Sequence, residues 1–171
     1  MKIKYDHLLG IPFEQGKSDC YSHLQKMYFD NLGLKLTDYA RPNDWWLYES
    51  MDLYKDNFKK EGFQIVDGEV QVMDVFLISI PDPRMPKRSV VNHAAIYIGE
   101  GYITHHLLGR MSEKLLYRGA MRNLTVMTLR HESMLNFKFV PIVEKPLDLM
   151  DYLLPHKRAL LQKAMPDGTK S

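Results

Sequence analysis

The hydrophobic pattern of this chain changes its period once, near residue 62, and that change limits the folds open to it. Before it, apolar side chains recur every three or four residues, as on one face of a helix. One helix is predicted from Cys20 to just before Gly33, and a second from the Asn43-Asp44 cap to Gly62. Both are amphipathic, with apolar stripes of Tyr21, Leu24, Tyr28 and Leu32, and of Leu47, Met51, Tyr54 and Phe58.

After residue 62 the pattern is that of strands. We predict strands over 70–80, 92–98, 102–107, 124–130 and 137–143, with Gly99-Glu100-Gly101 as a three-residue hairpin turn between the second and third. Helices first and strands afterwards indicate an α+β fold, with N-terminal helices packed on a mostly antiparallel sheet. We expect this domain to cover residues 1–143, followed by a helical extension over 144–171. That extension is either a docking segment or a part that packs on the domain's own surface.

Composition excludes several classes of protein. The formal net charge of the 171 residues is only +2, so the strongly basic surface of a nucleic-acid-binding protein is not expected. No run approaches the roughly 18 apolar residues of a membrane span. The first residues lack the apolar core of a signal peptide, which predicts synthesis in the cytoplasm without a cleaved leader. The single cysteine, Cys20, excludes an intramolecular disulfide.

The position of Cys20 suggests chemistry. A helix N-terminus offers free N–H groups and a partial positive charge, which favour a thiolate and predict a lowered pKa. His93 opens a predicted strand and is the candidate general base. His105, on the returning strand, would orient it if the turn has three residues; a two-residue turn would bring His106 there instead. The alternative is that these are structural core residues.

Zinc is the other chemistry that these residue types allow. Cys20, His93, His105 and His106 are possible ligands. Adjacent histidines on a strand face opposite sides, however, and the chain has no second cysteine. We therefore expect neither a metal nor another cofactor.

Three sequence stretches resemble the NlpC-type cell-wall peptidases. The run 10–16, GIPFEQG, followed by Asp19-Cys20-Tyr21-Ser22, resembles the signature around the catalytic cysteine. The run 93–99, HAAIYIG, resembles the strand of the catalytic histidine, and 73–77 resembles the first core strand. Residues 28–41 and Trp45-Trp46 are more similar to the branch found in bacteriophage tail proteins. The resemblance covers roughly residues 8–132.

This resemblance implies a papain-like fold and a function. Cys20, His93 and His105 would hydrolyse an amide of the peptidoglycan stem peptide through an acyl-enzyme, with Phe13, Asp19 and Tyr21 contacting substrate. The family usually has a tyrosine where this chain has Phe13, so a hydroxyl donor would have to come from elsewhere, for instance Tyr5 or Tyr21.

The expected setting is a phage tail. A wall-cutting enzyme without a leader could reach its substrate as part of the tail tip of the virion, with other tail-tip proteins as partners. The alternatives are a structural tail-assembly component with little turnover, and an amidase or acyltransferase on the same scaffold.

Overall fold

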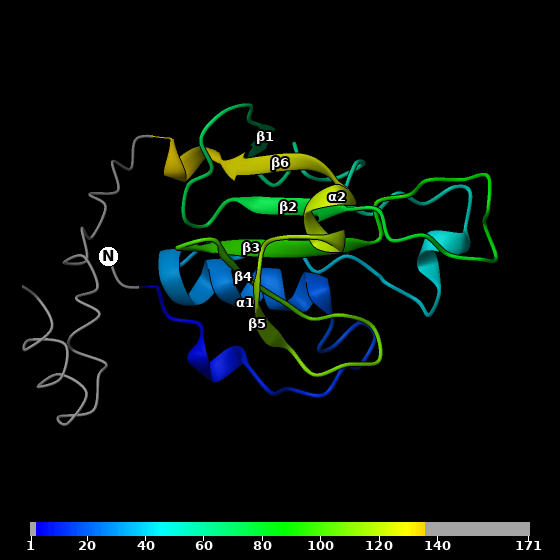
Figure 1. The fold of residues 1–171 in the computed structure, drawn as a ribbon, viewed down its shortest axis with the longest axis horizontal. Coiled ribbons are helices and arrows are strands. Elements are labelled where there is room, and N and C mark those ends of the chain that lie inside the picture. The colour runs from blue at the N-terminus through cyan, green and yellow to red at the C-terminus, as the bar shows by residue number, and fades with distance from the viewer. Residues whose placement is uncertain (1–2, 136–171) are drawn as a thin grey trace, which may run out of the picture. The chain divides into compact units, whose positions relative to one another are not determined.

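A computed structural model describes residues 3–135 of the chain. Within them a six-stranded antiparallel sheet carries one long helix and several short ones, so the predicted α+β class is confirmed (Figure 1). The predicted strand over 137–143 and the helical extension over 144–171 lie outside the described residues. In the described part of the chain, none of the helices combines the length and apolar character that crossing a membrane requires.

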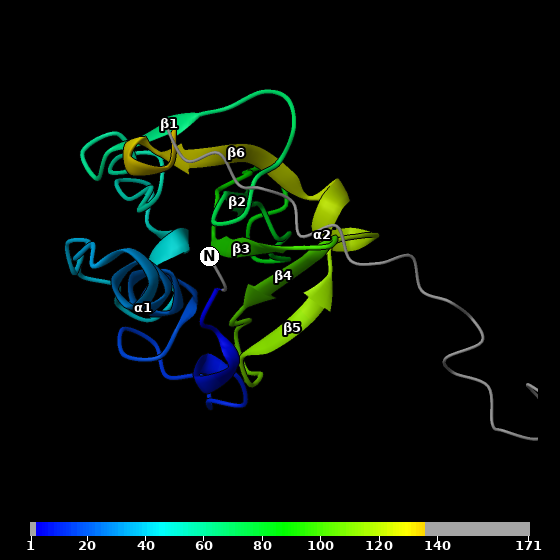
Figure 2. The same cartoon turned by 90° about the vertical axis from the view of Figure 1, so that its left-hand side faces the viewer.

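Helix α1, Cys20–Leu32, begins and ends where the sequence predicts. The side chain of Asp19 accepts a hydrogen bond from the Ser22 N–H at 2.8 Å, which caps the first turn. Gly33 has φ +68°, and its N–H donates to the Phe29 carbonyl at 2.8 Å, which ends the helix. Figures 1 and 2 show α1 alongside β3 on one face of the sheet.

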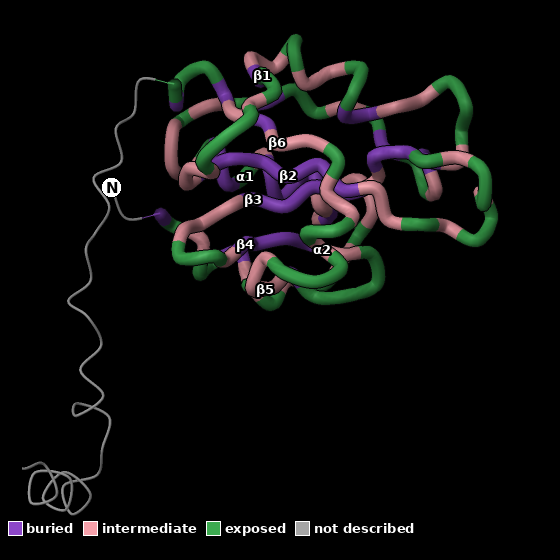
Figure 3. Tube along the Cα trace, turned by 45° about the horizontal axis from the view of Figure 1, so that its top comes forward, coloured by how far each residue is buried: buried purple, intermediate pink, exposed green. Residues whose placement is uncertain are grey.

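The sheet has the strand order β1-β6-β2-β3-β4-β5, and all its neighbours are antiparallel. The centre of the sheet is buried: all four residues of β2 are buried, as Figure 3 shows by colour. Arg130 of β6 donates hydrogen bonds of 2.7 and 2.8 Å to the buried carboxylate of Asp74, which fixes the start of β2 beside β6. The strands are β1 Phe63–Ile65, β2 Val75–Ile78, β3 His93–Gly99, β4 Tyr102–His105, β5 Glu113–Leu116 and β6 Thr125–His131.

The prediction of a second α-helix is wrong. Residues 44–62 form the 3-10 turn η2, Trp45–Leu47, and then a series of turns. Asp44 has φ +55°, which is incompatible with the predicted helix cap. The apolar stripe nevertheless faces the core, because Tyr54 is buried and Leu47, Met51 and Phe58 pack against the same cluster.

Five short elements were not predicted. Strands β1 and β5 have three and four residues, too few to show a period, and β5 reads Glu-Lys-Leu-Leu without alternation. Helix α2, Ala120–Asn123, and the 3-10 turn η3, Glu132–Met134, are single turns. Another short 3-10 turn, η1, Asp6–Leu8, lies near the N-terminus.

Candidate active site

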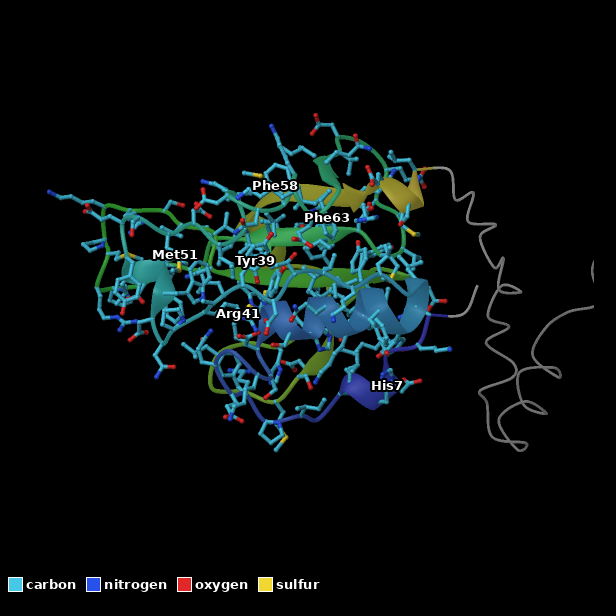
Figure 4. All side chains as sticks on the ribbon, turned by 180° about the vertical axis from the view of Figure 1, so that it is seen from behind. His7, Tyr39, Arg41, Met51, Phe58 and Phe63 are labelled. Carbon is cyan, nitrogen blue, oxygen red and sulfur yellow. The ribbon has the colours of Figure 1, made fainter. Side chains whose placement is uncertain are left out.

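Cys20 is the first residue of α1, and a buried ion pair holds the turn that precedes it. Arg41 Nε donates to Asp19 Oδ2 at 2.9 Å, and both side chains are almost fully buried. Arg41 also donates to Asp38, to the Ser22 hydroxyl and to two backbone carbonyls, so its donors are fully used. Figure 4 shows Arg41 beside the helix. The Asp19–Arg41 ion pair and the helix cap therefore hold Cys20 in position together.

A cavity of about 560 Å³ opens beside Cys20. Its walls are mostly apolar, and a few polar groups converge on it, as is usual for small-molecule and peptide sites. The cysteine lines it together with Phe13, Asp19, Trp46, His93 and His106.

The sulfur of Cys20 contacts the start of β3 and a tyrosine. The Ala94 N–H donates to it, and Tyr54 Oη lies 3.2 Å away. Burial raises the pKa of the thiol to about 11, and the Asp19 carboxylate acts in the same direction. This direction is opposite to the lowering expected from the helix N-terminus, because burial disfavours the charged thiolate.

His93 lies next to Ala94 and is brought against His105. Its Nε2 is 3.0 Å from His105 Nδ1, and both rings are buried. Burial lowers the pKa of His93 well below its usual range, and the neighbouring His105 adds to this effect. A neutral imidazole with one ring nitrogen held by His105 keeps its other nitrogen, Nδ1, available as a base.

The turn that places His105 differs from the prediction. Gly99 pairs with Tyr102, so the turn has two residues, Glu100 and Gly101, both at positive φ. A β-bulge between Tyr97 and Gly99 inserts one residue into β3. The bulge reverses the side-chain parity that the shorter turn would give, and it therefore brings His105, rather than His106, to the side of His93.

The second nitrogen of His105 faces a carboxylate. His105 and Glu113 are directly opposite in the β4–β5 pairing, and Nε2 is 3.7 Å from Glu113 Oε1. Burial lowers the pKa of His105, and the carboxylate opposes that shift. Among the described residues this Nε2 has no hydrogen-bond partner.

His106 follows directly after β4 and lines the same cavity as Cys20 and His93. Its ring packs edge-on against Phe13 at 5.3 Å and lies 6.4 Å from the ring of His23, whose Nε2 is bonded to Thr104 Oγ1 at 2.9 Å. Within residues 3–135, no group of three or more His, Cys, Asp or Glu side chains is arranged to hold a metal ion.

The residues predicted to contact substrate separate into two groups. Phe13 and Asp19 line the cavity, although the Asp19 oxygens already serve the helix cap and Arg41. Tyr21 is not among the lining residues, and its hydroxyl donates to the Thr37 carbonyl at 2.8 Å. Tyr5, the other proposed hydroxyl donor, contacts Lys114.

Two residues of this site were missed by sequence reasoning. Tyr54 and Glu113 lie 34 and 93 positions from Cys20, on segments whose local pattern carries no catalytic signature. Tyr54 was assigned to the core stripe of the predicted second helix, and no signal in a single sequence distinguishes it from the other apolar positions there.

The chain is similar to known proteins over most of its length. The chain is 34% identical over 128 residues to Tail tip assembly protein K of Escherichia phage lambda, and 28% identical over 126 residues to the protein of the same name of Escherichia phage N15. These matches cover 74% and 73% of this chain, but it spans only 60% and 49% of the two relatives. Residues 10–130 match the NlpC/P60 family, a range that includes Cys20, His93 and His105, and the chain therefore belongs to the NlpC/P60 family.

Proposed function

We propose that this chain is a cysteine endopeptidase of a phage tail tip that hydrolyses an amide bond in the peptidoglycan stem peptide. The observation that carries the proposal is a single constellation. Cys20 and His93 line one cavity, and His93 Nε2 is held by His105 Nδ1 at 3.0 Å. A nucleophile, a base and a group that orients the base are the minimum set for acyl transfer.

In this mechanism the reaction begins with Cys20 as a neutral thiol and His93 as a neutral imidazole. As the Cys20 sulfur attacks the scissile carbonyl carbon, the thiol proton passes to His93 Nδ1 and the carbonyl oxygen becomes an oxyanion. Collapse of this intermediate breaks the C–N bond, and His93 gives its proton to the leaving amine. Water then attacks the thioester, with His93 as base; the C–S bond breaks, His93 returns the proton to the Cys20 sulfur, and the acid product leaves. His105 keeps the His93 ring in one orientation during both steps.

The setting of the proposal is the virion. Both relatives are named for tail tip assembly, which supports a place in the tail tip beside other tail proteins. There the domain would meet the peptidoglycan of the host cell.

A structural role in tail assembly is the second candidate. The names of the relatives favour it, and so does Phe13, which brings no hydroxyl to the cavity. In this case the chain would keep the fold while turning over little or no substrate.

Digestion of purified muropeptides separates the two functions. Wild-type protein should release new amino termini detectable by mass spectrometry, and Cys20→Ala and His93→Gln should abolish this release. His131→Gln changes a buried histidine of β6 that does not line the cavity, and it should retain activity. Cleavage that survives Cys20→Ala would refute the mechanism, whereas a wild type without activity on any muropeptide would favour the structural role.

A further inference from the structure

The hydroxyl of Tyr54 is the polar side-chain group in hydrogen-bond contact with the candidate nucleophile. Its Oη lies 3.2 Å from Cys20 Sγ. Sulfur is a weak donor and a phenol a good one, so we assign the proton of this contact to Tyr54.

The position of this hydroxyl is fixed by packing. The Tyr54 side chain is 4% exposed, and its ring lies edge-on to Tyr21 at 6.0 Å and to Trp45 at 6.1 Å. Trp45 packs against Trp46, whose indole N–H donates to Asp82 at 2.9 Å. Because packing holds this hydroxyl in place, it stays beside the Cys20 sulfur. No conformational free energy is then spent to bring it there during the reaction.

The phenol also remains protonated. Burial raises the pKa of Tyr54 well above its usual range, and the contact with Cys20 adds to the shift. It therefore acts as a hydrogen-bond donor near neutral pH, and it does not compete with His93 as a base.

Acyl transfer needs such a donor. The negative charge develops first on the sulfur, and the Tyr54 hydroxyl lies 3.2 Å from that atom. Phe13, on the wall of the same cavity, has no proton to donate.

We propose that Tyr54 is a catalytic residue of this site, whose O–H stabilises the forming thiolate of Cys20. This inference rests on the proposed peptidase function. It adds to that function the hydroxyl of a residue that belongs to neither the motif around Cys20 nor the motif around His93. No proton is transferred by Tyr54, so the balance of the reaction is unchanged: the thiol proton still travels through His93 to the leaving amine.

The test compares Tyr54→Phe with Tyr21→Phe. Each variant removes one buried, hydrogen-bonded hydroxyl and keeps the ring, but the Tyr21 hydroxyl contacts the Thr37 carbonyl instead of the sulfur. Thermal unfolding midpoints of both variants would be measured first, so that losses of folded protein are subtracted.

The first measurement needs no turnover. The Tyr54 hydrogen bond lowers the pKa of the thiol against the larger effect of burial. Tyr54→Phe should therefore move the pH profile of Cys20 alkylation by iodoacetamide to higher pH, while Tyr21→Phe leaves it in place. An unshifted profile in Tyr54→Phe would overturn the inference.

The second measurement is kinetic. Tyr54→Phe should lower kcat on muropeptides by about ten- to a hundredfold, the loss expected for one hydrogen bond to an atom that becomes charged in the transition state, with little change in KM. Full kcat in Tyr54→Phe would overturn the role of Tyr54 and leave the peptidase function standing. A wild type without activity would overturn the peptidase function, and the alkylation profile would then decide alone whether Tyr54 acts on the reactive sulfur.

Discussion

One nitrogen of His105 contacts His93, and the other lies 3.7 Å from Glu113. A carboxylate at that distance favours the tautomer of His105 that carries its proton on Nε2. Nδ1 of His105 is then an acceptor, His93 must donate from its own Nε2, and His93 Nδ1 is left as the base. Glu113 would thus determine the direction of the hydrogen-bond chain without touching substrate.

Glu113→Gln removes the charge while preserving the size of the side chain. We expect the pKa of His105 to fall further, since the carboxylate is the group that opposes burial there. Because the Glu113 side chain is 40% exposed, water and salt weaken its effect, and we expect a loss of about tenfold in kcat, at or below the low end of what general-base catalysis contributes.

The tautomer itself can be measured. Nitrogen-15 shifts of His105 should indicate a proton on Nε2 in the wild type and a mixture of tautomers in Glu113→Gln. Glu100→Gln, in the exposed turn between β3 and β4, is the matched control and should change neither quantity. Identical spectra in wild type and Glu113→Gln would exclude this positioning role.

At the scale of elements, the sequence predicted α1 and most of β2, β3, β4 and β6, since a regular apolar period over several residues reports which face is buried. The predicted helix over 43–62 failed because burial alone does not determine the backbone. Turns can direct Tyr54 and its neighbours to the core at the same spacing, and Trp46 is held through Asp82, far along the chain.

The candidate site was predictable to a similar extent. Local motifs pointed to Cys20, His93 and His105, whereas the bulge that brings the two histidines together has no signature in HAAIYIG. Tyr54 and Glu113 reach the site through tertiary packing and strand pairing, which a single sequence does not encode locally.

The Asp19–Arg41 pair gives the element-scale prediction. Both side chains are about 2% exposed or less, so Arg41→Gln would leave a buried carboxylate without its counter-charge. We expect a loss of about 3–5 kcal/mol in the free energy of unfolding, as for other broken buried ion pairs. Urea unfolding followed by circular dichroism measures this loss.

Asp38→Asn provides the control within the same network. Asp38 also accepts from Arg41, at 2.8 Å, but its side chain is 74% exposed. Exposed pairs contribute about 0–1 kcal/mol, so Asp38→Asn should be nearly neutral. Equal losses in the two variants would mean that burial of Asp19 does not determine the strength of the pair.

At the scale of the whole molecule, the buried histidines couple folding to pH. Burial lowers the pKa of His23 to about 3 and also lowers that of His93 and His105, and neighbouring histidines add to the lowering of all three. In the unfolded chain these groups take up protons near pH 6.5, whereas in the folded protein they stay neutral to lower pH. The unfolded state therefore binds more protons between these values, and stability must fall as the pH is lowered from about 6.5.

Each such histidine contributes a slope of up to about 1.4 kcal/mol per pH unit. The free energy of unfolding, measured in urea at several values between pH 7.5 and 4.5, should fall steadily over this window.

The ion pair of Asp19 does not contribute there: burial raises its pKa, but the Ser22 N–H and Arg41 outweigh that effect and hold it lowered, so its loss comes at more acid pH. His23→Gln can keep a hydrogen bond to Thr104. Because glutamine cannot be protonated in the unfolded chain, this variant should reduce the slope of unfolding free energy against pH by up to about 1.4 kcal/mol per pH unit. A wild-type stability that does not change from pH 7 to 5 would show that these histidines keep ordinary pKa values in the folded protein, and that burial does not lower them.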